Sequence, residues 1–176
     1  PPSGPLAIGA TTLAAAEQGV DFIADLGVRG GTPPYTATVT KGVLPGGLKF
    51  TWTTLGGKPS SAKTAKITVK VTDKDNSTVT RQYTLTVLKP VTVSTKSLKA
   101  GAVGKAFKGA LAVTGGKGPY SWSYAGTLLD DLGLIFDTGT GKITGTPFAP
   151  DSGNVTFSVT DALGITAQKA LTLTIK

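Results

Sequence analysis

Few side chains in this sequence could carry out chemistry. The 176 residues contain no Cys and no His, which excludes thiol nucleophiles, His-based triads, haem ligation and zinc sites. Two groups of oxygen donors remain. Asp73, Asp75 and Asn76 could ligate Ca²⁺, and Asp130-Asp131 is the only adjacent pair of carboxylates.

Neither group fits its chemistry well. A calcium site needs six to eight oxygens, and the segment where two repeats meet offers Lys89, Lys96 and Lys99 rather than acids. Adjacent carboxylates on a strand point to opposite faces, whereas glycoside hydrolysis needs two that face each other across a sugar. We therefore expect no bound metal and no catalytic residue.

A Gly-Lys pair at Gly141-Lys142 suggests a phosphate-binding loop. That loop requires a Gly five residues before the Gly-Lys pair and a Ser or Thr directly after it. Phe136 and Ile143 occupy those two places. The segment is predicted to be an ordinary turn, so the sequence indicates no cofactor and no enzymatic activity.

The sequence consists of two tandem copies of one repeat. Gly30-Gly31-Thr32-Pro33-Pro34-Tyr35 recurs as Gly115-Gly116-Lys117-Gly118-Pro119-Tyr120, and Val71-Thr72-Asp73 recurs as Val159-Thr160-Asp161. The offset grows by three residues between these motifs, and we assign the insertion to the loop at residues 124–133. The copies meet near Lys89-Pro90, which predicts domains at residues 1–89 and 90–176.

Within each copy, apolar and polar residues alternate with a period of two. Ile67–Thr72 and Leu171–Ile175 are examples, with Thr at the polar places. This pattern predicts half-buried antiparallel strands. Thr11–Gly19 has the composition of a capped helix, but its repeat partner does not, so we predict strand and turn there.

Many short strands with frequent turn residues and no helix predict an all-β fold of two tandem immunoglobulin-like β-sandwiches. Trp122 is expected to be the buried central Trp of the second sandwich. Ala37 is its equivalent in the first, so Trp52 is a candidate to fill that core instead. Lys66, Lys70 and Lys74 are expected to protect a sheet edge from pairing.

The sequence resembles the bacterial "putative Ig" domains found in tandem in large secreted and surface proteins. The second copy carries the Thr-Gly-x-Ile-x-Gly-Thr-Pro element of that family at Thr140–Pro147, whereas Thr51–Ala62 of the first copy lacks it. The resemblance implies spacer, adhesion or carbohydrate-proximal roles and carries over no catalytic residue.

The sequence also indicates two further sets of residues: one that forms tight turns, and one that plugs the sandwich or contacts a partner. Tight turns with positive φ are expected at the Gly-Gly pairs, with the following Pro fixing the exit. The leucines of the 124–133 loop either plug the end of the sandwich or form an apolar contact for a partner. The turn residues are Gly30, Gly31, Gly115, Gly116, Pro34 and Pro119; the possible partner contacts are Leu128, Leu129 and Leu132.

The net charge of +8 comes from 18 basic and 10 acidic residues, and only Arg29 and Arg81 of the basic ones are Arg. This predicts a solvated Lys surface with weak attraction to anionic polymers and no specific nucleic-acid binding. No apolar run is long enough for a membrane helix, and the Pro-rich start does not resemble a signal peptide.

The sequence therefore predicts a non-catalytic module of a secreted or surface-anchored bacterial protein, which acts in adhesion, spacing or binding to a protein or glycan. It would be extracellular or on the cell surface. The alternative is a stand-alone structural subunit, such as a phage virion decoration protein or a filament subunit, on a virion surface. A third possibility, a carbohydrate-binding appendage, would need an exposed aromatic platform.

Overall fold

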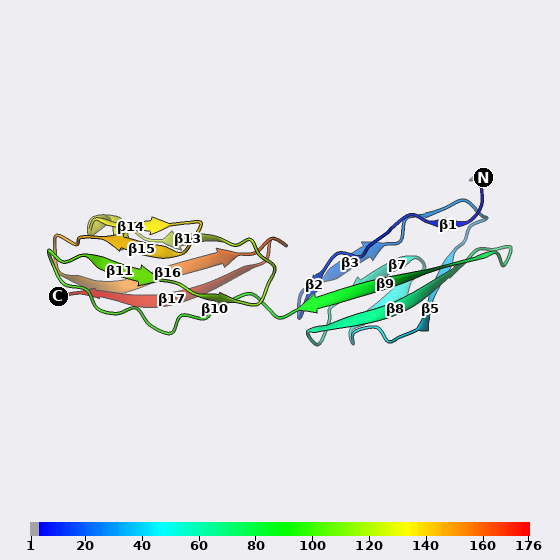
Figure 1. The fold of residues 1–176 in the computed structure, drawn as a ribbon, viewed down its shortest axis with the longest axis horizontal. Coiled ribbons are helices and arrows are strands. Elements are labelled where there is room, and N and C mark those ends of the chain that lie inside the picture. The colour runs from blue at the N-terminus through cyan, green and yellow to red at the C-terminus, as the bar shows by residue number, and fades with distance from the viewer. Residues whose placement is uncertain (1–3) are drawn as a thin grey trace. The chain divides into compact units, whose positions relative to one another are not determined.

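The protein is described from a computed structural model that covers residues 4–176. The chain divides into two compact units between Lys89 and Pro90. Both units consist of mainly antiparallel sheets packed face to face (Figure 1). Each unit has its own hydrophobic core, so each is described by itself.

Unit 1 contains a four-stranded sheet, a three-stranded sheet and a two-stranded pair. Strands β8 and β9 form the longest hairpin of the unit, and β2 pairs parallel with β9 at Ala16 and Val87. The sheets, in order of their strands, are β2 (Ala16–Glu17), β9 (Thr78–Leu88), β8 (Lys63–Thr72), β5 (Thr36–Lys41); β3 (Phe22–Asp25), β7 (Thr54–Gly57), β6 (Leu48–Thr51); and β1 (Ala7–Ile8), β4 (Val28–Arg29).

Unit 2 repeats this plan with two three-stranded sheets and a two-stranded pair. A parallel bridge joins Gly101 to Ile175, at the place of the β2–β9 pairing in unit 1. The sheets are β13 (Ser121–Ala125), β16 (Asp151–Thr160), β17 (Thr166–Ile175); β11 (Phe107–Ala110), β15 (Lys142–Gly145), β14 (Leu134–Asp137); and β10 (Thr92–Val93), β12 (Val113–Thr114).

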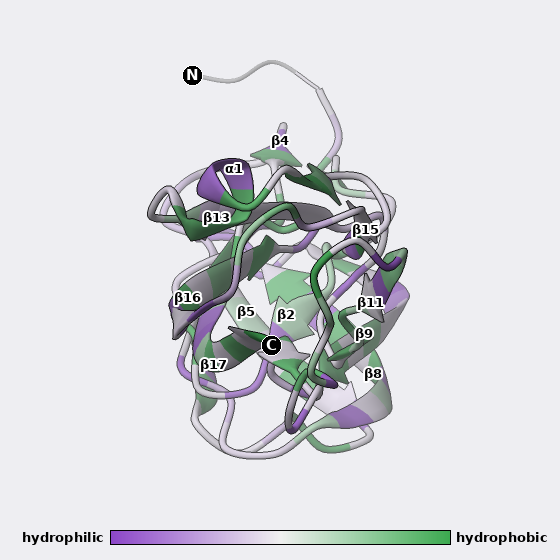
Figure 2. Ribbon diagram, turned by 90° about the vertical axis from the view of Figure 1, so that its left-hand side faces the viewer, coloured by the Kyte–Doolittle hydropathy of each residue, from purple (hydrophilic) through white to green (hydrophobic). Residues whose placement is uncertain are grey.

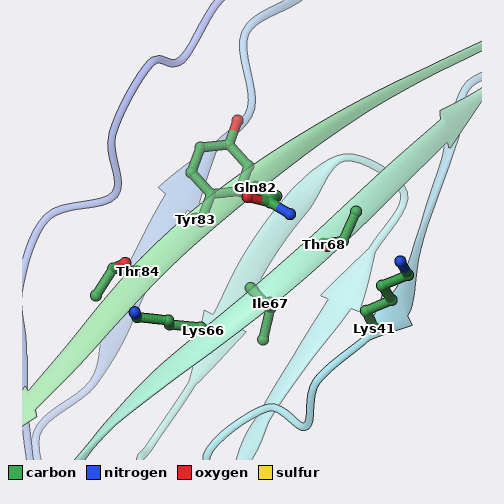
Figure 3. A pocket seen from close by; sticks show the side chains of 7 residues that line it. All are labelled: Lys41, Lys66, Ile67, Thr68, Gln82, Tyr83 and Thr84. Atoms are coloured by element: carbon green, nitrogen blue, oxygen red, sulfur yellow. The ribbon is translucent and has the colours of Figure 1, made fainter.

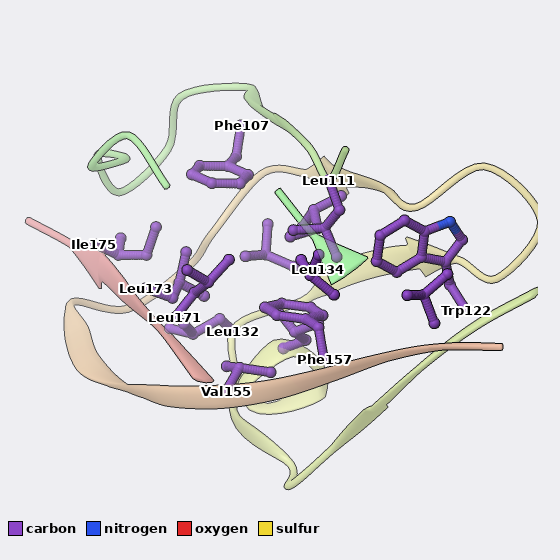
Figure 4. Close-up of a cluster of buried hydrophobic side chains, with 14 of the residues drawn as sticks. Phe107, Leu111, Trp122, Leu132, Leu134, Val155, Phe157, Leu171, Leu173 and Ile175 are labelled. Atoms are coloured by element: carbon purple, nitrogen blue, oxygen red, sulfur yellow. The ribbon is translucent and has the colours of Figure 1, made fainter. Parts of the chain in front are cut away.

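Along the strands, buried residues alternate with more exposed ones, as the period of two predicts. In β16, Val155, Phe157 and Val159 are buried, while the Thr and Ser residues between them are half-buried. Figure 4 shows the resulting core of unit 2, with Phe157 between Trp122 and the leucines. Burying a Val or Phe side chain stabilises the folded state by about 1.5–3 kcal/mol. The strands that bury one of their two faces are therefore the main source of stability.

Two local expectations are tested by the backbone. Residues 11–19 contain bends and the short strand β2 rather than a helix, so the repeat was the better guide than Ala content. The structure does add one helical turn that the sequence did not predict, α1 (Leu128–Asp131). Its hydrophilic part is purple in Figure 2.

The three-residue insertion lies mostly outside the loop to which the sequence assigned it. Leu48 pairs with Gly57 in unit 1, and Leu134 pairs with Gly145 in unit 2. The offset between copies is thus 86 at the first residue of each hairpin and 88 at the last. One inserted residue therefore precedes Leu134 and two lengthen the β14–β15 turn.

The two tryptophans have opposite environments, which corrects the expectation that Trp52 fills the core of unit 1. Trp122 is 6% exposed, whereas Trp52 is 65% exposed and has a φ of 56°. The backbone is nevertheless the same in both units. The N–H of Ala37 donates to Trp52 O at 2.9 Å, and the N–H of Trp122 donates to Thr138 O at 2.7 Å.

The lysines of β8 also need a correction. Strand β8 lies between β9 and β5, so Lys66 and Lys70 project from the middle of a sheet rather than from its edge. Lys74 follows β8 in the turn. Edge protection therefore does not explain why Lys66 and Lys70 are lysines.

The two tryptophans should respond differently to substitution. Trp122→Ala should destabilise the protein by about 3–5 kcal/mol because it leaves a cavity in the core. Trp52→Gly should leave stability unchanged or raise it, because Gly adopts positive φ without strain. Scanning calorimetry measures both, and equal losses in unfolding temperature would contradict the assignment of the two side chains.

Candidate binding surface

A buried aspartate closes one end of unit 1. The Oδ1 of Asp73 accepts hydrogen bonds from the backbone N–H groups of Asp75 and Ser77, at 3.0 and 2.8 Å. Its Oδ2 accepts the N–H of Thr32 at 3.1 Å. The same carboxylate thus joins the β8–β9 turn to the Gly-Gly turn.

Asp161 does the same in unit 2. Its Oδ1 accepts the N–H groups of Leu163 and Ile165, and its Oδ2 accepts the N–H of Lys117 at 2.8 Å. Both aspartates are about 5% exposed (6% for Asp73 and 5% for Asp161). Because backbone N–H groups already occupy these oxygens, neither carboxylate is arranged as a calcium ligand. Among residues 4–176, no group of three or more acidic, His or Cys side chains could hold a metal.

Burial alone would raise the pKa of the Asp73 carboxyl. The N–H groups of Thr32, Ser77 and Asp75 stabilise the ionised form, and together they lower its pKa below the ordinary value of 3.8. Asp73 therefore favours the folded state when it is ionised. The contribution is complete above the unfolded-state pKa and is lost as the pH falls through the lower folded-state pKa.

The Gly-Gly turns have the backbone that the sequence predicted. The φ values are 65° and 64° at Gly30 and Gly31, and 72° and 63° at Gly115 and Gly116. The peptide bonds before Pro34 and Pro119 are cis. In each unit the following Tyr hydroxyl donates back to the turn, Tyr35 to Gly30 O and Tyr120 to Gly115 O, at 2.9 and 2.8 Å.

The leucine loop is mainly part of the core. Leu129 and Leu132 are 0% and 1% exposed and belong to the hydrophobic cluster of unit 2, while Leu128 packs against it half-buried. The structure corrects the partner-contact interpretation for Leu129 and Leu132, because α1 turns them inward. These two leucines plug the sandwich and offer no surface to a partner.

The remaining carboxylates that were considered for chemistry also serve the fold. Asp130 accepts the hydroxyl of Tyr124, and this hydrogen bond is the largest cause of a raised Tyr124 pKa. Asp137 accepts the N–H groups of Gly139 and Thr140 at 2.9 and 3.0 Å. The amides that a phosphate loop would offer are thus already bound.

A hollow of about 490 Å³ lies on the outer face of the four-stranded sheet of unit 1. It forms where β5 leaves β8. The register shifts between Val39 and Lys41, and Gly42 then approaches Lys66 O so closely that a Cβ would clash with it. In Figure 3, Thr68 lies between Lys41 and the Lys66 side chain, which points towards Thr84. The lining residues are Lys41, Lys66, Ile67, Thr68, Gln82, Tyr83 and Thr84.

Sequence reasoning did not find this hollow. The alternation of residues places Lys66, Thr68, Gln82 and Thr84 on one face of the sheet. The bulge in β5 was not predictable, because no Gly, Pro, Asn or Asp precedes Gly42 in that strand. The hollow combines two ammonium groups, two hydroxyls and an amide. Such a set can bind an oxygen-rich anion but has no group suited to catalysis.

The architecture of both units is that of the immunoglobulin-like β-sandwiches. A family model described as "putative Ig domain" matches residues 5–88 and 89–176. The chain therefore belongs to the putative Ig domain family, as two consecutive copies. None of the curated proteins compared matches the sequence.

Several solved structures are similar to this chain in fold. Domains 3–5 of Drosophila OTK match with a TM-score of 0.56 and 14% identity over 97% of this chain and 62% of that one. The C-terminal fragment of intimin, crystallised with the intimin-binding domain of Tir, matches with a TM-score of 0.52 and 16% identity over 95% of this chain and 62% of that one. Immunoglobulin domains 1–4 of Sidekick-1 match with a TM-score of 0.50 and 13% identity over 97% of this chain and 48% of that one. The chain spans less than two thirds of each of these structures.

The described part of the chain, residues 4–176, contains no helix long and apolar enough to cross a membrane.

Asp73→Asn should destabilise unit 1 most at neutral pH. The variant loses the charge that the three N–H groups stabilise, so the difference from the wild type should shrink as the pH falls below the unfolded-state pKa near 3.8. Urea unfolding at pH 7 and at a pH near 2 measures this difference. Asp21→Asn, at an exposed site 3.7 Å from Lys58, is the control and should change little at either pH.

Gly116→Ala should destabilise unit 2 by more than the roughly 1–2 kcal/mol that left-handed backbone costs a residue with a Cβ. The added Cβ would lie 2.8 Å from Val91 Cβ and 2.9 Å from Asp161 Oδ2. Gly104→Ala is the matched control, since its φ is 71° and nothing lies within 4 Å of the added atom. Equal losses in chemical unfolding would show that the close approach is unimportant.

Proposed function

We propose that the chain is a non-catalytic binding and spacing module of a secreted or surface-exposed bacterial protein. The observation that carries this proposal is the match of the putative Ig family to both copies, residues 5–88 and 89–176. Each copy has its own core and its own Asp-linked turns, so the chain consists of two compact units.

The carboxylates support the same proposal. Asp25, Asp73, Asp137 and Asp161 each accept backbone N–H groups and hold turns. Groups committed in this way are poor candidates for moving protons in a reaction. These four carboxylates therefore stabilise turns rather than provide acid–base groups.

The similar structures support the extracellular setting and the choice of partners. OTK contributes extracellular domains to the comparison, and intimin was crystallised in complex with a domain of its receptor. By analogy, a protein or glycan partner at a surface is the expected ligand of this chain. The stand-alone subunit of a virion or filament remains the second candidate, with the same fold.

The native polypeptide tests the proposal. In the cells that make it, an antibody against unit 1 should detect the chain on intact cells, and protease added outside should remove it. Its intact mass should exceed 17.8 kDa. A mass of 17.8 kDa in purified particles would favour the stand-alone subunit. A location confined to the cell interior would contradict the surface module.

A further inference from the structure

The three strands around the hollow of unit 1 carry charges of one sign. Strands β5, β8 and β9 contain no acidic residue, and Lys41, Lys66 and Lys70 belong to two of them. The described residues show no ion pair for any of these three lysines. Their positive charge is therefore available to a ligand.

The residues around the lysines are neutral hydrogen-bonding groups. Lys41 is the register partner of Thr68, Lys66 that of Thr84, and Thr68 also that of Gln82. Directly opposite side chains on one face have Cβ atoms roughly 4.5–5.5 Å apart. Side chains with hydroxyl or amide groups are thus neighbours of both lysines on the hollow.

We propose that this hollow binds a polysaccharide that carries carboxylates, with Lys41 and Lys66 of the hollow and Lys70 beside it on the carboxylates and Thr68, Thr84 and Gln82 on sugar hydroxyls. The proposal rests on the proposed function of a surface binding module and names its ligand. Charge complementarity carries the choice. Lys66 and Lys70 lie four residues apart on one strand, roughly 13 Å, and this modest charge density suits one carboxylate per sugar better than a dense polyphosphate.

Nucleic acid fits this face less well. Readers of bases and phosphates use Arg and exposed aromatic rings, but Arg81 donates to Ala10 O at 3.0 Å. Tyr83 is 4% exposed and donates its hydroxyl to the same oxygen at 2.8 Å. The hollow therefore offers no ring or guanidinium for stacking. The proposed polysaccharide is held by charge and hydrogen bonds, in contrast to a carbohydrate-binding appendage that stacks sugars on an aromatic platform.

Unit 2 supplies an internal control for the lysines. In the β16–β17 hairpin, Asn154 pairs with Thr172 as Lys66 pairs with Thr84, and Ser158 pairs with Gln168 as Lys70 pairs with Thr80. The chain thus holds the same sheet with Asn and Ser in place of the two lysines. Substituting these residue types into unit 1 should preserve the fold while it removes the charge.

The experiment compares the full wild-type chain with K66N/K70S and with K99N/K105S, which removes two exposed lysines of unit 2. Each variant lowers the net charge by two from +8. Calorimetric titration with polygalacturonate at low ionic strength should give wild-type affinity that falls with added salt. The hollow variant should lose roughly tenfold, and the control variant less than twofold.

Three further polymers test whether the hollow prefers carboxylates to neutral sugars, sulfates and phosphates. Neutral dextran should not bind, and dextran sulfate and duplex DNA should bind more weakly than polygalacturonate at 0.15 M salt. NMR amide shifts of the full chain with polygalacturonate should concentrate at Thr68, Gln82 and Thr84.

Four outcomes would overturn the proposal: equal losses in both variants, shifts concentrated in unit 2, tighter binding to DNA or dextran sulfate, or no binding by the wild type. Unfolding midpoints of the variants show whether they are folded. A chain found on the cell surface without affinity for polygalacturonate would refute this inference and leave the proposed function standing.

Discussion

One buried carboxylate in each unit holds together segments that are far apart in the sequence. Asp73 and Asp161 accept backbone N–H groups from a Gly-Gly turn and from a hairpin turn about 40 residues later (|i−j| of 41 and 44). A backbone N–H that is buried without a partner is costly, so these turns depend on the carboxylate for their shape. The turns in turn set where the strands enter the sheets, and the cores form between those sheets.

The same frame carries different surfaces in the two copies. The backbone hydrogen bond from Ala37 N–H to Trp52 O in unit 1 has its counterpart in the bond from Trp122 N–H to Thr138 O in unit 2. In unit 1 the Trp lies in the turn and is exposed, whereas in unit 2 the Trp is the donor to the turn and is buried. Lys66 and Asn154 likewise share a place in the register. Because the backbone tolerates these exchanges, binding properties can differ between copies without a change of fold.

The sequence predicted the features that depend on local pattern. The alternation in β8 and β16 fixed which residues are buried, and paired glycines indicated positive φ at the turns. Features that depend on strand order were not predictable: Lys66 was assigned to an edge although β8 is central, and the hollow needs the bulge in β5. Trp52 failed as a core residue because it lies in the two-residue turn between β6 and β7, where its side chain is exposed, and residue type alone does not reveal this.

The parallel contact between the first part of each unit and its last strand has a mechanical consequence. In unit 1 it joins β2 to β9, and in unit 2 Gly101 and Ile175, where Gly101 N–H donates to Thr174 O and Lys176 N–H to Gly101 O. Tension on the ends of a unit slides parallel strands past each other, so their hydrogen bonds are loaded in shear and must break together. A hairpin pulled open at one end would instead lose its bonds one at a time. Each unit is thus built to resist stretching where its chain enters and leaves.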